Sequence, residues 1–361
     1  MKKSISIILA ILILTTITTV FAVEGQWFSI EESKSLATEN SKQTAIDDLT
    51  IKSKESALED AQEDAKMSTG GNGKSDMLNN KIAKEVTPLK AAADLEYAKR
   101  LREENVDKLE LEVYKATSKV LLVERELELE KSKQDILVKK YEMAQVRFSE
   151  GKLTENDLND AKYALDLKTI DVNKATKKLE TADLDLKRVL GLDMNGELVG
   201  IKDDLVLTST DDIDIEKVVE EALKNDVELY IKAENLKASE KTMEFAKEIY
   251  EEDTVEYDAK MLELENAKVD FDDAKVNLEV SIRNKYNDIL TAKDKVELAQ
   301  KWEKINKSKL DNAEFKFEKG IISKEEVLNE KEKYLDSQYQ TFLAIYDYNT
   351  VKTEFDTLYI K

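Results

Sequence analysis

The chain has 361 residues, 37% of them charged, with only nine glycines and one proline, a composition typical of long helices and coiled coils. Its formal net charge of −21 argues against nucleic acid as a partner, because an acidic surface repels phosphate backbones. The absence of cysteine and histidine excludes disulfides, thiol and imidazole catalysis and most zinc sites. We therefore expect a non-enzymatic helical protein with no cofactor and no bound metal.

The N-terminal segment has the pattern of an export signal. Lys2 and Lys3 precede a mostly apolar run that extends to Phe21, and Ala22 ends a stretch suited to cleavage. Residues 1–22 are therefore predicted to be a signal peptide. An uncleaved membrane anchor is the alternative, because the run approaches the length that spans a bilayer. Both interpretations place the remaining chain outside the cytoplasm.

A short turn motif occurs twice, as RFSEGKLTENDLNDA at 147–161 and KFEKGIISKEEVLNE at 316–330. In each copy a glycine can end one helix in the left-handed conformation. Three residues later a hydroxyl residue is suited to cap the next helix, with an acidic residue as its capping-box partner. The residues that fill these positions are Gly151, Thr154 and Asp157 in the first copy and Gly320, Ser323 and Glu326 in the second. Each copy is predicted to close an antiparallel helical hairpin.

The first turn is flanked by long apolar repeats. Apolar residues keep alternating three- and four-residue spacing from Val106 to Phe148, and again from Leu158 to Val189. Only Glu130 and Gln134 interrupt the apolar character of the first stretch. A sustained seven-residue period is typical of a coiled coil, so residues 91–148 are predicted to form one helix roughly 87 Å long.

The same pattern returns 169 residues later, from Leu278 to Phe317 and from Val327 to Leu358. The last helix has a second apolar face formed by Leu335, Phe342 and Ile345. A helix with two such faces needs two neighbours, which two hairpins side by side or several chains in a ring would supply.

The segments SIEESKSLATENS and DIEKVVEEALKND also match each other, which extends the duplication upstream of the hairpins. We predict a first helical repeat at 23–191 with its turn near 149–154 and a second at 214–361 with its turn near 318–323. Residues 192–213 join the repeats and have room for a short strand. Between its opening helix and its turn, the first repeat is 16 residues longer than the second, and the extra length is expected in the glycine-containing connector near 67–90.

At this point the chain resembles the TolC family of outer-membrane efflux proteins. Both repeats have the family's order of an opening helix, a long helix, a glycine turn and a second helix. VLG at Val189–Gly191 is similar to the LLG with which the family's repeats often end. The resemblance covers almost all of residues 28–361. It implies a trimeric helical tunnel for efflux in the cell envelope, with the turns at the tunnel's inner end against a membrane-fusion-type adaptor and its inner-membrane transporter.

The resemblance also implies roles for the residues of the turns. The expected adaptor-docking tips consist of Phe148, Gly151, Leu153 and Thr154 in the first hairpin and Phe317, Gly320, Ile322 and Ser323 in the second. Asp157 and Glu326 match the family's acidic pore constriction, although their place in a capping box explains the same carboxylates. The family's usual Val-Gly-Leu is Glu-Gly-Lys and Lys-Gly-Ile here, which leaves the identity of the partner open.

The chain departs from the family in its connectors. A transmembrane strand needs about 9–11 alternating residues. The connector near 67–90 has no such alternation, and residues 249–258 are too short for two strands and carry five acidic side chains. We therefore expect an all-α, TolC-like tunnel protomer without a transmembrane barrel. The alternative function is an exported structural or adhesive coiled coil with no transport role.

Overall fold

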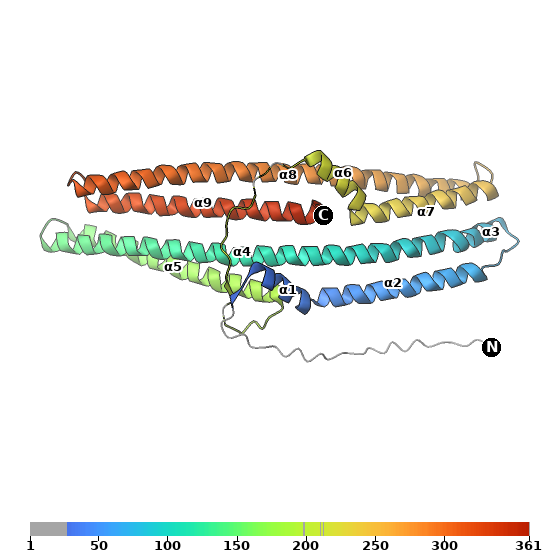
Figure 1. Ribbon diagram of the computed structural model, residues 1–361, viewed down its shortest axis with the longest axis horizontal. Helices are drawn as coiled ribbons and strands as arrows, with labels where there is room; N and C mark the ends of the chain where they lie inside the picture. Colours follow the sequence, from blue (N-terminus) through green and yellow to red (C-terminus); the bar gives the residue numbers. More distant parts are fainter. Residues whose placement is uncertain (1–26, 198, 210, 212, 361) are drawn as a thin grey trace.

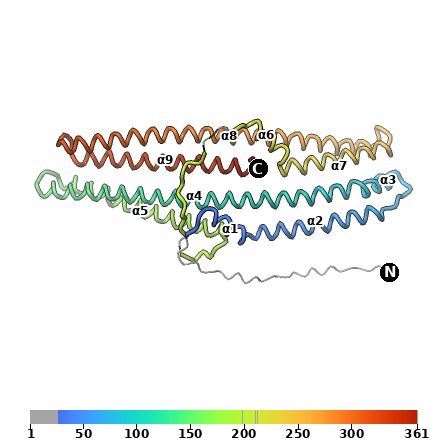
Figure 2. Tube along the Cα trace, in the orientation of Figure 1, coloured from blue at the N-terminus to red at the C-terminus, as the bar shows by residue number. Residues whose placement is uncertain are grey.

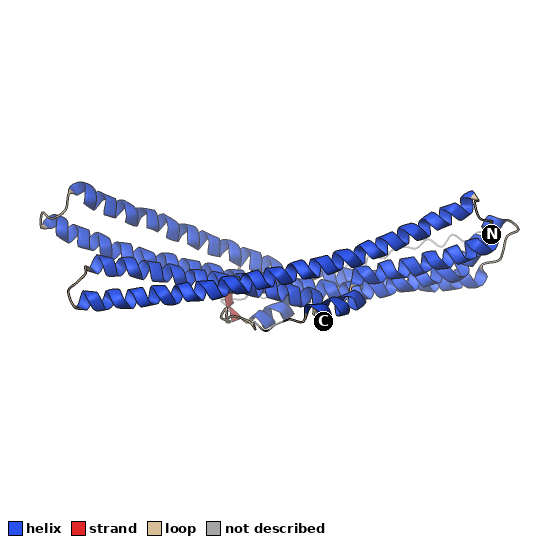
Figure 3. Cartoon of the chain, turned by 90° about the horizontal axis from the view of Figure 1, so that it is seen from above, coloured by secondary structure: helices blue, strands red, loops and turns tan. Residues whose placement is uncertain are grey.

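The computed structural model describes residues 27–197, 199–209, 211 and 213–360, so the predicted signal peptide at 1–22 lies outside the described residues. The described chain is a long bundle of antiparallel helices (Figure 1). The predicted all-α architecture of long hairpins is confirmed. Two-residue strands, β1 (Trp27–Phe28) and β2 (Gly200–Ile201), pair in parallel near the middle of the molecule (Figure 3).

Two helices run almost the whole length of the bundle, namely α4 (Thr87–Ser149) and α8 (Val255–Glu318). On one half of the bundle they return as α5 (Glu155–Leu190) and α9 (Lys324–Tyr359). On the other half they are accompanied by α2 (Lys42–Met67) and α7 (Val227–Ile249). Because α4 contacts both α5 and α9, and α9 contacts α8, these four helices form a layer in the order α5, α4, α9, α8.

The two halves of the chain contain the same succession of elements. The short opening helices α1 (Ile30–Asn40) and α6 (Ile215–Asn225) have 11 residues each. The long helices α4 and α8 have 63 and 64 residues, and α5 and α9 have 36 each. The trace in Figure 2 shows each half leaving the middle of the bundle toward one end, crossing to the other end as its long helix, and returning to the middle.

The connector of the first half is more helical than its sequence suggested. Residues 67–90 were expected to link two helices, but they contain α3 (Lys74–Lys81), a π-helical turn at Ile82–Val86 and the start of α4. The long helix therefore begins at residue 87 rather than 91. Pro88 lies in the first turn of α4, directly after the π-helical turn, in which the Thr87 N–H donates to the Ile82 carbonyl. The first turn is the part of a helix in which proline, which has no N–H, is best tolerated. The corresponding connector of the second half is a turn between α7 and α8.

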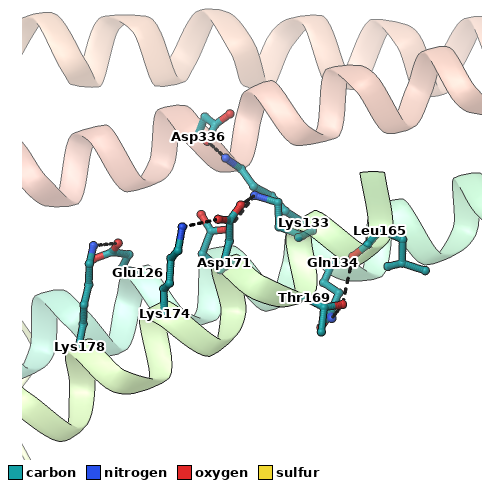
Figure 4. Close-up of polar contacts among 11 residues, drawn as sticks. Glu126, Lys133, Gln134, Leu165, Thr169, Asp171, Lys174, Lys178 and Asp336 are labelled. Atoms are coloured by element: carbon teal, nitrogen blue, oxygen red, sulfur yellow. Dashed lines mark hydrogen bonds and ion pairs between the residues drawn. The ribbon is translucent and has the colours of Figure 1, made fainter. Parts of the chain in front are cut away.

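The two polar residues that interrupt the apolar pattern of α4 both form contacts within the first hairpin. Lys168 of α5 lies 2.8 Å from Glu130, and both side chains are largely covered. Gln134 donates a hydrogen bond of 2.9 Å to the Thr169 hydroxyl (Figure 4). Each polar side chain that breaks the apolar pattern of α4 therefore has a partner on α5, and the helical register continues unchanged.

The core is concentrated near the middle of the bundle. One cluster lies among α1, α4, α5 and β2 and includes Val113, Leu186 and Ile201. A second lies among α6, α8 and α9 and includes Ile282 and Phe355. Phe342 packs against the first cluster, and Ile345 packs against both, so the two apolar faces of the last helix contact two neighbours.

The segment between the halves is fixed at both ends by buried side chains. Asp183 of α5 accepts a hydrogen bond of 2.7 Å from the backbone N–H of Val199. Asn349 of α9 accepts one from the Thr208 N–H and donates another to the Val206 carbonyl, at 3.0 and 2.7 Å. These bonds satisfy backbone groups that no helix or sheet pairs, and they hold the segment across the hairpins.

Candidate docking site at the hairpin tips

Both hairpin turns have the same backbone geometry. Gly151 and Gly320 have φ values of 73° and 69°, in the left-handed region that ends helices. The N–H of Gly151 donates to the Phe148 carbonyl at 2.9 Å, and the N–H of Gly320 donates to the Phe317 carbonyl at 2.8 Å. A Cβ atom at either glycine would have no neighbour within 4 Å. The turns therefore need glycine for its backbone conformation and not for space.

The helices that leave the turns both begin with a complete capping box. The Thr154 and Ser323 hydroxyls accept hydrogen bonds from the backbone N–H groups of Asp157 and Glu326, each at 3.2 Å. In return the Thr154 N–H donates to Asp157 at 3.1 Å, and the Ser323 N–H donates to Glu326 at 2.8 Å. The predicted caps are confirmed, and they fix the direction in which each chain leaves its turn.

The capping bonds also lower the pKa of the two carboxyls. The pKa of Asp157 lies below its ordinary value because the Thr154 hydroxyl and then its N–H donate to the carboxylate. The pKa of Glu326 is lowered by the Ser323 N–H and then by the Ser323 hydroxyl. Both side chains lie in solvent, so both carry a negative charge at neutral pH.

Apolar side chains remain uncovered at the tips. Phe148 and Phe317 are exposed, whereas Leu153 and Ile322 are half-buried. Ile322 packs in a small cluster with Leu310 and Val327. In the second hairpin Ile322 and Val327 therefore form a hydrophobic staple, which joins residues on either side of the cap. The Phe317 ring also contacts the Lys324 ammonium at 5.0 Å, so its exposed part is what remains for a partner.

The two tips are joined by an ion pair that the sequence did not single out. Arg147, at the end of α4, lies 3.3 Å from Glu325, at the start of α9. One heptad farther from the tip, Lys140 lies 3.2 Å from Glu332. Lys133 pairs with Asp336 in the same way (Figure 4). The seven-residue spacing of Lys133, Lys140 and Arg147 places them on one basic face of α4. That spacing does not indicate which helix carries the acidic partners.

A shallow groove lies between α4 and α9 beside these pairs. It encloses about 600 Å³ and is lined by Met143, Val146 and Leu328 together with charged side chains of both helices. Val146 is exposed, and Leu328 is buried at the base of the groove. An apolar floor with charged walls can hold one more helical element, since the same combination lines the seams inside the bundle.

Within the described ranges no group of three or more acidic side chains could hold a metal ion. No helix among the described residues is both long enough and apolar enough to cross a bilayer. The tips form a surface that consists of the two turns, the exposed aromatic rings and the groove between adjacent hairpins.

No family model and no curated protein sequence matches the chain, but solved structures match it over most of its length. The outer membrane protein VceC of Vibrio cholerae aligns with a TM-score of 0.67 at 10% identity, over 91% of this chain and 94% of that protein. The open MtrE outer membrane channel of Neisseria gonorrhoeae gives a TM-score of 0.62 at 11% identity, over 95% and 93%.

The CmeC outer membrane channel of Campylobacter jejuni is similar to the same extent, with a TM-score of 0.63 at 12% identity, over 91% of this chain and 85% of that protein. At such low identities the agreement concerns the arrangement of helices and not the chemistry of individual side chains. The chain therefore has the fold of TolC-family outer-membrane channels, as its sequence resemblance implied.

Proposed function

We propose that the protein is a component of an envelope export system, in which copies of the chain form a helical conduit and dock an adaptor through the hairpin tips. The similar solved structures are outer-membrane channels, which supports a role in efflux. The observation that carries the docking proposal is the groove between α4 and α9. Its lining includes Arg147, next to Phe148 in the sequence, and Lys324, whose ammonium lies 5.0 Å from the Phe317 ring.

The proposed occupant of the groove is a helical hairpin of an adaptor protein. A helix of the adaptor would cover Met143 and Val146 and place its own charges beside Lys139, Glu142 and Lys324. Burying exposed apolar side chains is the main driving force for such packing, and the charged walls would set its register. The adaptor would connect the conduit to an inner-membrane transporter. The resemblance to the TolC family suggests three copies of the chain per conduit.

Asp157 and Glu326 are proposed to line the narrow entrance of the conduit. Both carboxyls lie in solvent beside the turns, and the cap bonds that lower their pKa keep them charged at neutral pH. In an assembly of several copies they would form a ring of negative charge. Such a ring would favour cationic over anionic solutes.

Crosslinking from the groove tests the docking proposal. A photoreactive residue at Val146 should capture an adaptor in intact cell envelopes, and the transporter should be recovered with it. The same residue at Val255, an exposed position at the opposite end of the bundle, is the matched control. Recovery of cell-wall components from both positions, with no adaptor from either, would favour the structural or adhesive alternative.

A substitution in the groove gives an independent measurement. Val146→Glu changes an exposed residue and should leave the helical content unchanged, but it places a charge where the adaptor's apolar face must pack. We expect at least a tenfold loss of co-purified adaptor, with no loss for Val255→Glu. Equal recovery from both variants would refute docking at this groove.

A further inference from the structure

Asparagine stands directly before glycine twice in the chain, at Asn72–Gly73 and Asn195–Gly196. Asparagine is among the chemically labile residues, because its side-chain amide can be lost. The loss begins when the backbone nitrogen of the next residue attacks the asparagine side chain. Glycine has no Cβ to hinder that approach, so both dipeptides are candidate sites of modification. Both asparagines are exposed, so exposure alone does not distinguish them.

Asn72 lies in the loop between α2 and α3, at the end of the bundle opposite the hairpin tips (Figure 1). Gly71 and Gly73 flank it, and neither has a side chain that would restrict rotation of the loop backbone. Within the part of the chain that the structure describes, no hydrogen bond restrains the Asn72 side chain or the Gly73 N–H. The attacking nitrogen and the amide that it attacks are therefore both free to approach each other.

Asn195 lies in a turn after α5 in which the corresponding groups are engaged. The Gly196 N–H donates to the Asp193 carbonyl at 3.2 Å, and the Gly196 carbonyl accepts from the buried Lys187 ammonium at 2.7 Å. The Asn195 N–H donates to the Asp193 carboxylate at 3.1 Å, and the Asn195 side-chain amide lies 3.4 Å from the same oxygen. Attack on Asn195 requires several of these bonds to break, which adds to its barrier.

We propose that Asn72 is a site of spontaneous deamidation and that the hydrogen bonds of the Asp193 turn protect Asn195. The Gly73 nitrogen gives its proton to solvent base and forms a bond to Cγ of Asn72, and ammonia leaves from that carbon. The product is a five-membered succinimide ring. Water then adds to one of the two ring carbonyls and breaks its bond to the nitrogen, which leaves aspartate or isoaspartate at position 72. Water is the only co-reactant, and nothing is oxidised or reduced.

The isoaspartate product should loosen the contact between the two repeats at this end of the bundle. It adds one carbon atom to the main chain directly before Gly73, the residue that precedes α3 and whose carbonyl accepts the Met77 N–H at 2.9 Å. Leu78 of α3 is buried in one cluster with Phe245 of α7, and the Lys81 ammonium lies 4.8 Å from the same ring. A displaced start of the helix should therefore make α3 separate from α7 more often.

Mass spectrometry of a single digest compares the two sites within the same molecule. Trypsin releases Asn72 in residues 67–74 and Asn195 in residues 189–202, so each site lies on a short peptide of its own. After incubation of the folded protein in mildly alkaline buffer, we expect deamidation at Asn72 to be at least tenfold faster than at Asn195. Digestion in water labelled with heavy oxygen marks any reaction that occurs during the digest. Equal rates in the folded protein would overturn the proposal.

Unfolding the protein should remove the difference between the two sites. In concentrated guanidinium chloride the turn around Asn195 is lost, so we expect the two rates to converge to within a few-fold. A tenfold difference that persists in the unfolded chain would mean that the neighbouring sequence sets the rates, and protection by the fold would be refuted.

A variant of the turn measures the protection in the folded protein. Asp193→Ala removes the carboxylate that holds Asn195 and changes an exposed side chain. It should speed deamidation at Asn195 several-fold and leave the rate at Asn72 unchanged, which makes Asn72 the internal control. If Asn195 reacts no faster in this variant, its hydrogen bonds to Asp193 are not what protects it.

Hydrogen exchange tests the structural consequence. Aged protein that carries isoaspartate should exchange the amides of residues 74–81 at least threefold faster than fresh protein, with no change within α5. Asn72→Gln should show no such effect of ageing, because glutamine must form a larger ring and does so far more slowly. Asn72→Asp adds the charge without the extra main-chain carbon and should resemble fresh protein. If aged and fresh protein exchange alike, the contact of α3 with α7 does not depend on the loop.

Discussion

At the scale of single residues, the turn glycines have only a conformational role. Both lie at positive φ and have open space around them, so an added methyl group would meet no atom but would strain the backbone. Gly151→Ala and Gly320→Ala are each expected to lower the free energy of unfolding by about 1 kcal/mol. Urea unfolding followed by circular dichroism measures this. Asn at the same positions should cost less, because Asn adopts the left-handed conformation more readily; an Ala variant as stable as the parent would contradict the argument.

The capping carboxyls predict a local dependence on pH. Folding lowers the pKa of Asp157 and Glu326 below their ordinary values of 3.8 and 4.5. A lowered pKa means that the ionised form is favoured in the folded state, so the contribution is complete above the ordinary value. It is lost as the pH falls through the lowered pKa. The ends of α5 and α9 should therefore fray in acid while the centres of the helices remain formed.

Amide hydrogen exchange at residues 154–157 and 323–326 measures this fraying. After correction for intrinsic rates, protection should be constant from neutral pH to about pH 5 and should fall below it. Asp157→Asn keeps an acceptor for the cap but removes the ionisation, so its protection at the first tip should not vary with pH in this way. A parent protein with pH-independent protection at both tips would show that the carboxylates do not hold the caps.

At the scale of elements, one buried ion pair holds the segment between the halves. Asp183 and Lys187 lie 2.6 Å apart on α5, and each is only 3% exposed. Asp183 also accepts the Val199 N–H, and Lys187 donates to the Gly196 carbonyl at 2.7 Å. The pair therefore satisfies two backbone groups of the segment as well as its own charges.

Removing one partner of this ion pair should lower the free energy of unfolding far more than removing an exposed acidic side chain nearby. Asp183→Ala leaves the Lys187 charge buried without its carboxylate, and we expect a loss of about 3–5 kcal/mol in the free energy of unfolding. Asp185→Ala, on the exposed side of the same helix, should change it by less than about 0.5 kcal/mol. Urea unfolding compares the two, and limited proteolysis within 192–201 should be faster only for Asp183→Ala. Similar losses for both variants would mean that the pair is not the anchor.

The elements themselves were predictable where local chemistry determines them. Gly151, Thr154 and Asp157 specify a helix end and a helix start within seven residues, so the turn could be located without knowledge of its neighbours. The connector at 67–90 was harder, because its glycines and Pro88 are typical of loops as well as of a first helical turn. The Arg147–Glu325 pair and the tip groove were missed because they depend on which hairpin lies beside which, and heptads do not specify that.

At the scale of the whole molecule, the chain is a rod, and its dimensions in solution follow from its longest helix. The 63 residues of α4 span about 95 Å, and a thin rod of that length has a radius of gyration of roughly 27 Å. A compact globule of 361 residues would have a value of about 21 Å. Small-angle X-ray scattering of the smallest species separated by size should therefore give at least 27 Å.

Assembly should change the longest dimension of the particle in a way that depends on how the copies join. Copies that join edge to edge with their tips aligned add width without adding length, so the longest dimension should grow much less than the mass as the species become larger. End-to-end association would instead lengthen the particle in proportion to its mass. Scattering from successive oligomers distinguishes the two modes. A longest dimension that doubles in the dimer would be incompatible with a conduit whose helices run side by side.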